Sequence, residues 1–260
     1  MSPSAPADRA DAAERLSSLR ALRDRAGLFL DFDGTLSEIA PTPGAARPVA
    51  GAADVLSRLA DRFAVVALVS GRPASDVRSL LDVPGVDVFG QYGLGTVTRP
   101  ADGGAVAAAR TEVEEAASSR PGAWVEDKGA SVAVHVRGAD RPDDAAGALR
   151  PVLERIAAAH GLVVFTGKMV LELAPADTPG KGAVVTREVR DRGLQACLYA
   201  GDDVADLAAF AALDELAAGG IVAMKVAVDG PETPQDLRTA ADEVVDGPVG
   251  LVRLLEVVAS

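Results

Sequence analysis

The chain has 260 residues, with 26 Lys and Arg against 38 Asp and Glu, so its formal net charge at pH 7 is −12. This acidic balance excludes nucleic-acid binding through a broad basic surface and disfavours attachment to an anionic membrane, because both depend on Lys and Arg. The single cysteine, Cys197, excludes an intrachain disulfide framework and a cysteine-based zinc site. With 48% hydrophobic residues, the composition predicts a soluble, folded protein of one or two domains.

The first residues are not typical of a targeting segment. Residues 1–14 lack both a basic start and an apolar stretch, so no signal peptide or anchor is expected there. No apolar run approaches the roughly 20 residues that span a bilayer. We expect a disordered Ser/Pro/Ala-rich tail that leads into a short helix near residues 8–24, and a cytoplasmic location.

Short apolar runs alternate with helical patterns up to residue 90, which is typical of parallel βαβ units. The predicted strands cover 27–31, 63–69 and 86–89. The predicted helices cover 50–61 and a segment that begins at Pro73.

The pattern then changes to that of an α+β insert. A polar helix (about 105–119) precedes two strands, one helix and two further strands. These cover 124–127, 131–137, 142–159, 162–165 and 169–173, with a Gly-Lys turn between the last two strands.

After Pro175 the α/β pattern resumes with a helix from Lys181, a strand over 196–200, a helix over 204–217 and a strand over 221–228. The predicted fold class is therefore α/β, a Rossmann-like core with a parallel sheet plus a smaller inserted α+β domain. The expected domains are an N-terminal tail and helix (1–26), a discontinuous core (27–103 and 176–260) and an inserted cap (104–175).

Polar residues gather at the predicted strand ends, where open α/β sheets collect their ligands. Asp31 and Asp33 follow the first strand in DFDGT. The other polar residues of this kind are Ser70, Gly71 and Arg72 after the second strand, Lys181 at a helix start, and Asp202, Asp203 and Asp206 after the strand over 196–200. Separate stretches of sequence should therefore converge on one site.

These residue types indicate phosphate chemistry. Clustered carboxylates repel one another unless a cation lies among them, and oxygen ligands without His or Cys favour Mg²⁺. Ser70 and Lys181, together with a helix N-terminus, offer donors to an anion. Asp31 is then placed to attack phosphorus, and Asp33 could pass a proton to the leaving oxygen and later accept one from water.

Four motifs in this order (DFDGT, VSGR, the isolated Lys181 and GDD) resemble those of haloacid-dehalogenase-type phosphatases. Three further segments, 90–94 (GQYGL), 125–137 (VEDKGASVAVHVR) and 167–175 (GKMVLELAP), resemble trehalose-6-phosphate phosphatases. The likeness runs from about residue 27 to the C-terminus. It implies a haloacid-dehalogenase-like core, a Mg²⁺-dependent cleavage of trehalose 6-phosphate through an aspartyl-phosphate, and trehalose-6-phosphate synthase as a candidate partner.

The resemblance also implies roles for individual residues. Asp31 would be the nucleophile, Asp33 the general acid and base, and Ser70 and Lys181 the groups that hold the phosphoryl oxygens. Two of the residues expected to bind the sugar, Glu126 and Lys128, are two positions apart on a predicted strand of the cap, so their side chains point to one face. The implied metal ligands are Asp31, the main-chain carbonyl of Asp33, Asp202, and Asp203 and Asp206 directly or through water; the implied substrate-binding residues are Gly71, Arg72, Glu126, Lys128 and Glu172.

The chain departs from the family pattern G-D-D-x-T-D-E at two positions, where Ala205 replaces Thr and Leu207 replaces Glu. Such losses near a metal weaken its binding by roughly 10- to 100-fold, so we expect an active enzyme with reduced Mg²⁺ affinity. The two histidines (His135 and His160) and Cys197 are assigned structural roles.

Three alternatives stay open. The first is a phosphatase for another sugar phosphate, such as a sucrose or mannosylglycerate phosphate. The second is a phosphomannomutase-like transferase, which a bisphosphate activator would reveal. The third is a catalytically impaired protein that binds a sugar phosphate, which would bind its ligand without turnover.

Overall fold

The computed structural model of the chain describes residues 6–40, 42–96, 103–167 and 169–260. The expected N-terminal tail begins outside the described residues. Lys168 of the predicted Gly-Lys turn also lies outside them. The chain forms two compact units: a larger, discontinuous one (1–93 and 179–260) and an insert (94–178).

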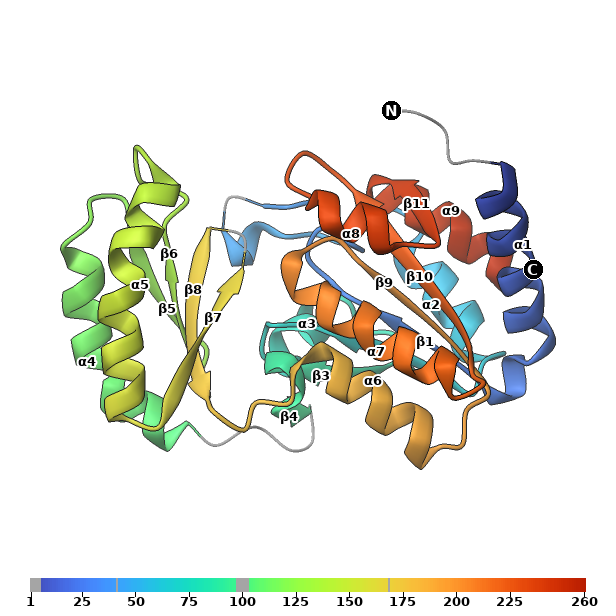
Figure 1. The fold of residues 1–260 in the computed structure, drawn as a ribbon, viewed down its shortest axis with the longest axis horizontal. Helices are drawn as coiled ribbons and strands as arrows, with labels where there is room; N and C mark the ends of the chain where they lie inside the picture. The colour runs from blue at the N-terminus through green and yellow to red at the C-terminus, as the bar shows by residue number, and fades with distance from the viewer. Residues whose placement is uncertain (1–5, 41, 97–102, 168) are drawn as a thin grey trace. The chain divides into compact units, whose positions relative to one another are not determined.

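A twisted parallel sheet forms the centre of the larger unit (Figure 1). In this unit its strands lie in the order β11-β10-β9-β1-β2-β3, and each neighbouring pair is parallel. Every residue of β1, β2 and β9 is buried, as expected for strands covered on both faces. The predicted α/β fold class is confirmed. The strands are β1 (Ala26–Leu30), β2 (Val65–Val69), β3 (Asp87–Gly90), β9 (Ala196–Gly201), β10 (Val222–Asp229) and β11 (Glu243–Asp246).

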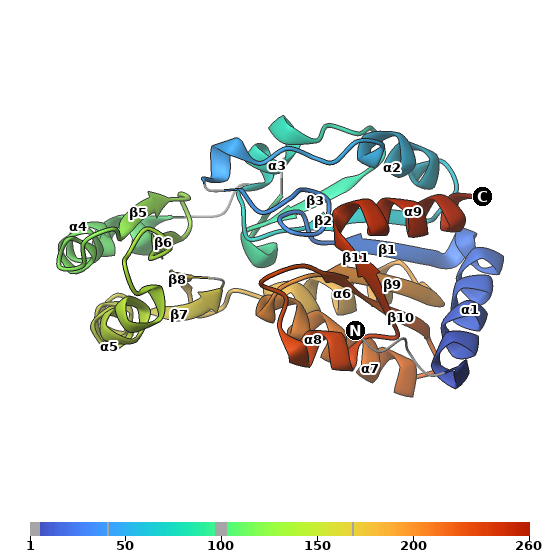
Figure 2. The ribbon, with the colours of Figure 1, turned by 90° about the horizontal axis from the view of Figure 1, so that it is seen from above.

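Helices cover both faces of this sheet (Figure 2). The first layer consists of α1 (Pro6–Ala21), α2 (Ala52–Ala60), α3 (Ala74–Leu80) and α9 (Gly247–Ala259). The second consists of α6 (Gly180–Asp191), α7 (Leu207–Ala218) and α8 (Gln235–Ala240). Within the described residues, four 3₁₀ turns lie between these elements: η1 (Arg23–Arg25), η2 (Pro43–Ala45), η3 (Gln91–Gly93) and η4 (Val204–Asp206).

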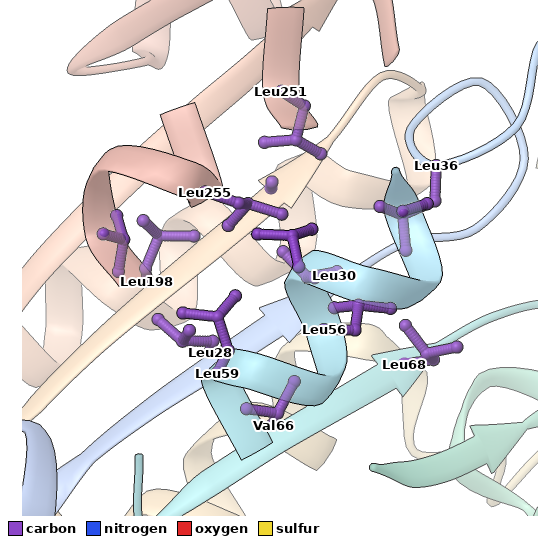
Figure 3. Close-up of a cluster of buried hydrophobic side chains, with 14 of the residues drawn as sticks. Leu28, Leu30, Leu36, Leu56, Leu59, Val66, Leu68, Leu198, Leu251 and Leu255 are labelled. Carbon is purple, nitrogen blue, oxygen red and sulfur yellow. The ribbon is translucent and has the colours of Figure 1, made fainter. Parts of the chain in front are cut away.

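Leucine packing joins the first helical layer to the sheet. Helix α2 buries Leu56 and Leu59 at helical spacing, and these lie among Leu28, Leu198 and Leu255 (Figure 3). Each fully buried leucine contributes about 1.5–3 kcal/mol relative to an exposed one, so this layer holds the strand ends in fixed positions.

The insert is an antiparallel sheet in the order β5-β6-β8-β7, with two helices against one face (Figure 1). Valines 132 and 134 and leucines 171 and 173 point to the helices and are fully buried. The other face carries the alternating residues, which include Glu126 and Glu172. The elements are β4 (Gly95–Thr96), α4 (Gly104–Ser118), β5 (Trp124–Asp127), β6 (Val132–His135), α5 (Pro142–Ala159), β7 (Leu162–Gly167) and β8 (Val170–Pro175).

Two details differ from the sequence prediction. The helix expected over 204–217 is divided into η4 and α7, because Asp203 and Asp206 form a capping box that closes one turn first. Elements α8, β11 and α9 were not predicted. No helix within the described residues has the length and apolar character needed to cross a membrane.

Candidate active site

Two neighbouring strands bring their terminal aspartates together. Asp31 follows β1 and Asp202 follows β9, and these strands pair in register as far as Leu30 and Ala200. The Asp31 amide continues the ladder by donating to the Ala200 carbonyl (2.9 Å). Both carboxylates are buried, at the carboxyl ends of the strands, where the sequence predicted a site.

Lys181, in the first turn of α6, lies between two buried carboxylates. Its Nζ is 3.0 Å from Asp31 Oδ2 and 2.7 Å from Asp206 Oδ1. Burial lowers the pKa of Lys181, but Asp206 and Asp31 together raise it above its ordinary value. Lys181 is therefore a permanently charged donor at the strand ends.

Asp206 receives four hydrogen bonds. Oδ1 accepts from Lys181 Nζ and from the Tyr199 hydroxyl (2.6 Å). Oδ2 accepts from the backbone amides of Asp202 (2.9 Å) and Asp203 (2.8 Å). An ionised carboxylate has about four lone-pair sites, so these bonds use its full accepting capacity.

Asp31 and Asp202 could hold a cation directly, with Asp206 close beside them. Oxygens of Asp31, Asp202 and Asp206 all lie within 4.8 Å of one another. The Thr35 hydroxyl donates to Asp202 Oδ1 (3.2 Å) and orients it. Gly34, at φ +76°, allows this packing, because a Cβ there would lie 2.0 Å from Asp202 Oδ2.

Electrostatics favour a cation at this place. Burial raises the pKa of Asp31, Lys181 opposes the rise, and the neighbouring Asp206, Asp202 and Asp33 add to it. A bound cation would remove this repulsion and keep the Asp31 carboxylate ionised. An all-oxygen donor set fits a hard divalent ion.

Asp33 is held by Arg72 rather than by the buried cluster. Arg72 donates from Nε to Asp33 Oδ2 (2.6 Å) and from Nη2 to Oδ1 (2.7 Å), a bidentate pair. The Arg72 amide also donates to Ser70 Oγ (3.1 Å). Between them, Gly71 lies so close to Tyr92 that a Cβ would come within 2.7 Å of the Tyr92 hydroxyl.

A strained turn supports this loop. Gln91 (φ 51°) and Tyr92 (φ 55°) are consecutive non-glycine residues in the left-handed region. Their amides donate to the carbonyls of Arg72 (2.9 Å) and Ser70 (3.0 Å). Strain of about 1–3 kcal/mol per residue persists where the surrounding structure requires it, which is typical of functional sites.

In the insert, two of the predicted sugar-binding residues form a buried ion pair. Lys128 Nζ is 2.9 Å from Glu172 Oε2, and the Ser131 hydroxyl donates to Glu172 Oε1 (2.5 Å). Glu126 and Glu172 both pair with Ala133 across the sheet, so their side chains share one face.

Glu126 is held by His135, whose Nε2 lies 2.8 Å from Glu126 Oε2. The His135 ring stacks on Trp124, with centroids 4.0 Å apart and planes 9° apart. His160 contacts Glu112 instead (2.8 Å), in an exposed pair. The structural role assigned to His160 fits this position. His135, in contrast, contacts Glu126, which is a candidate sugar-binding residue.

The predicted site residues thus fall into two groups, one in each unit. Sequence reasoning missed three supporting groups: Thr35, Ser131 and Tyr199. A tyrosine inside a fully buried strand was a usable signal for Tyr199, because a buried hydroxyl needs a partner. Asp203 is not among the three clustered carboxylates, and its side chain accepts from the Val204 amide (2.6 Å). The larger unit holds Asp31, Asp33, Ser70, Gly71, Arg72, Lys181, Asp202, Asp203 and Asp206, and the insert holds Glu126, Lys128 and Glu172.

Comparison with known proteins identifies relatives over most of the chain. The sequence model of the family described as trehalose-phosphatase matches residues 29–244. A trehalose-phosphate phosphatase of Mycobacterium avium is 35% identical over 246 residues, which cover 88% of this chain and 61% of that protein. The chain therefore spans less than two thirds of this relative's length.

Solved structures agree with the fold. The structure of a trehalose-6-phosphate phosphatase related protein matches with a TM-score of 0.70 and 25% identity, over 90% of this chain and 96% of that one. The C-terminal domain of a Candida albicans trehalose-6-phosphate phosphatase matches with a TM-score of 0.78 and 21% identity, over 94% of this chain and 95% of that one.

Proposed function

The chain belongs to the trehalose-phosphatase family, and on that premise we propose that it hydrolyses trehalose 6-phosphate to trehalose and phosphate. The observation that supports this most directly is the contact of Lys181 with the buried Asp31 beside Asp202. A buried carboxylate next to a fixed cation, at the carboxyl end of a strand, is suited to attack an electrophilic phosphorus.

In the first step, an Asp31 oxygen bonds to phosphorus while the bond from phosphorus to the sugar oxygen breaks. Asp33 gives the leaving oxygen a proton, and trehalose departs. Water then attacks the aspartyl-phosphate, Asp33 takes its proton, and phosphate leaves with Asp31 restored. Because Arg72 holds both Asp33 oxygens, Asp33 must loosen this pair before it can transfer a proton.

Binding of the phosphoryl group falls to Lys181, which contacts Asp31, and to Ser70, which follows the neighbouring strand β2. Asp31, Asp202 and the main-chain carbonyl of Asp33 would hold Mg²⁺, which when bound neutralises charge on the phosphoryl oxygens. The four bonds that Asp206 accepts favour a positioning role, in which it holds Lys181 and the 202–203 loop in place.

The sugar would be bound by Glu126, Lys128 and Glu172 of the insert. The buried ion pair of Lys128 and Glu172 keeps these two side chains in one orientation. A site built from such fixed polar groups rejects analogues that lack the matching hydroxyls.

The deciding experiment measures phosphate release from trehalose 6-phosphate, with and without Mg²⁺, beside glucose 6-phosphate and sucrose 6-phosphate. We expect release that is selective for trehalose 6-phosphate and dependent on Mg²⁺, and none from Asp31→Asn, whose fold should be intact. Glu126→Ala should impair trehalose 6-phosphate hydrolysis more than that of a small phosphate ester.

The other outcomes point elsewhere. Selective release from another ester would keep the chemistry and overturn the substrate, and activation by a sugar bisphosphate would indicate a mutase. Ligand binding without turnover would indicate a binding protein. A cytoplasmic location and a trehalose-6-phosphate synthase partner belong to this proposal and are tested by cell fractionation and by co-purification with that synthase.

A further inference from the structure

The insert carries an aromatic pair on the same sheet face as the proposed sugar-binding carboxylates. Trp124 and His135 are directly opposed on β5 and β6, so their rings share one face and stack. Glu126, two residues after Trp124 on β5, points to that face as well. The opposite face is buried under α4 and α5.

The indole of Trp124 is partly exposed to solvent. Trp124 is 37% exposed. Because the His135 ring covers one face of the indole, the exposed area belongs to its other face and edges. A ligand that covered this apolar area would gain free energy from its removal from water.

His135 gives this surface a fixed geometry. Its ring supports the indole while its Nε2 contacts Glu126 Oε2 at 2.8 Å. One side chain therefore sets the distance between an apolar platform and a hydrogen-bond acceptor. A pyranose ring matches that combination, because it presents C–H groups on its face and hydroxyl donors around its edge.

We propose that Trp124 contacts the leaving sugar, with its exposed indole face packed against a pyranose ring and Glu126 accepting from a hydroxyl of that ring. His135 is a positioning residue for both. This inference rests on the proposed function for the identity of the substrate, and it makes Trp124 a determinant of preference for sugar phosphates over small phosphate esters. The indole contributes to binding and takes no part in the chemical steps.

Fluorescence tests this directly, because Trp124 is the only tryptophan in the chain. In Asp31→Asn, which should bind substrate without turnover, trehalose 6-phosphate and trehalose should each change the emission saturably. Inorganic phosphate, the control for events at the larger unit, should not. Emission that responds to no sugar, or equally to phosphate, would overturn the assignment.

Kinetics of variants provide the second test. Trp124→Ala should raise KM for trehalose 6-phosphate about tenfold with kcat within about twofold, the pattern of lost binding common to ground and transition states. KM for acetyl phosphate should not change. Trp124→Phe should have a KM for trehalose 6-phosphate between those of wild type and Trp124→Ala. If circular dichroism shows that the alanine variant does not fold, the phenylalanine variant decides the question. Val257→Ala, which removes an exposed apolar side chain of α9, is the matched control and should behave as wild type.

The two proposals fail in different ways. If wild type releases phosphate from trehalose 6-phosphate but Trp124→Ala and Trp124→Phe keep its KM, the Trp124 assignment is wrong and the proposed function stands. If wild type does not act on trehalose 6-phosphate, the proposed function is wrong, and the response of Trp124 emission to trehalose itself still decides whether this face binds a sugar.

Discussion

Removal of the Tyr199 hydroxyl tests the network that holds the candidate catalytic lysine. Tyr199 and Asp206 are both fully buried, and their bond of 2.6 Å joins a neutral donor to a charged acceptor. Such bonds contribute about 1.5–3 kcal/mol. In Tyr199→Phe, Asp206 Oδ1 still accepts from Lys181, so no charge is left without a partner. We therefore expect the lower part of that range, a loss of about 1.5–2 kcal/mol in the free energy of unfolding.

The effect should depend on pH in a defined way. Burial, and then the charges of Asp206 and Asp31, raise the pKa of Tyr199 well above its ordinary value. The hydroxyl therefore remains a donor in the folded state at neutral and mildly alkaline pH. In the unfolded chain it ionises near pH 10, so wild type loses stability above that pH and its advantage over Tyr199→Phe narrows there.

Urea unfolding followed by circular dichroism measures this difference at pH 7 and again at about pH 11, above the ionisation of tyrosine in the unfolded chain. Thr35→Val is the matched comparison, since it removes a longer hydroxyl–carboxylate bond (3.2 Å) from the same cluster and should cost less. A loss below about 0.5 kcal/mol for Tyr199→Phe would refute the reasoning, since this is the lower limit for an ordinary hydrogen bond.

One further variant tests the site, and one reagent tests the buried sheet. Gly34→Ala should displace Asp202, because the added Cβ would lie 2.0 Å from Oδ2 and the φ of +76° disfavours alanine by about 1–2 kcal/mol. Differential scanning fluorimetry should then show a much smaller rise in Tm with Mg²⁺ than in wild type; an equal rise would contradict the role of this close approach. Burial raises the pKa of Cys197 to about 12, so the thiol should resist iodoacetamide at pH 8 in the native protein and react in denaturant. Mass spectrometry measures the labelling, and fast native labelling would disprove the buried position.

The fold class was predictable because its signals are local. Five buried residues of β1 and five of β2 are apolar runs bounded by polar turns, and the leucines of α2 recur at helical spacing. Of the last elements, α8, β11 and α9, which were not predicted, β11 is short and half polar and pairs with β10 across an intervening helix. Its strand conformation depends on that neighbour, which the local sequence does not reveal.

Residue types and spacing determined which groups could do chemistry: aspartates after β1 and β9, a lysine at the start of α6, and Glu126 and Lys128 on one face of a strand in the insert. Only the tertiary structure decided how they are paired. Lys181 contacts Asp31 and Asp206 although 150 and 25 positions separate it from them, and the hydroxyl that completes this network comes from inside β9. The physical reason is that spacing along a strand fixes the face on which a side chain lies, whereas a hydrogen bond between strands and helices requires the packing of the whole core to bring its two atoms within about 3 Å.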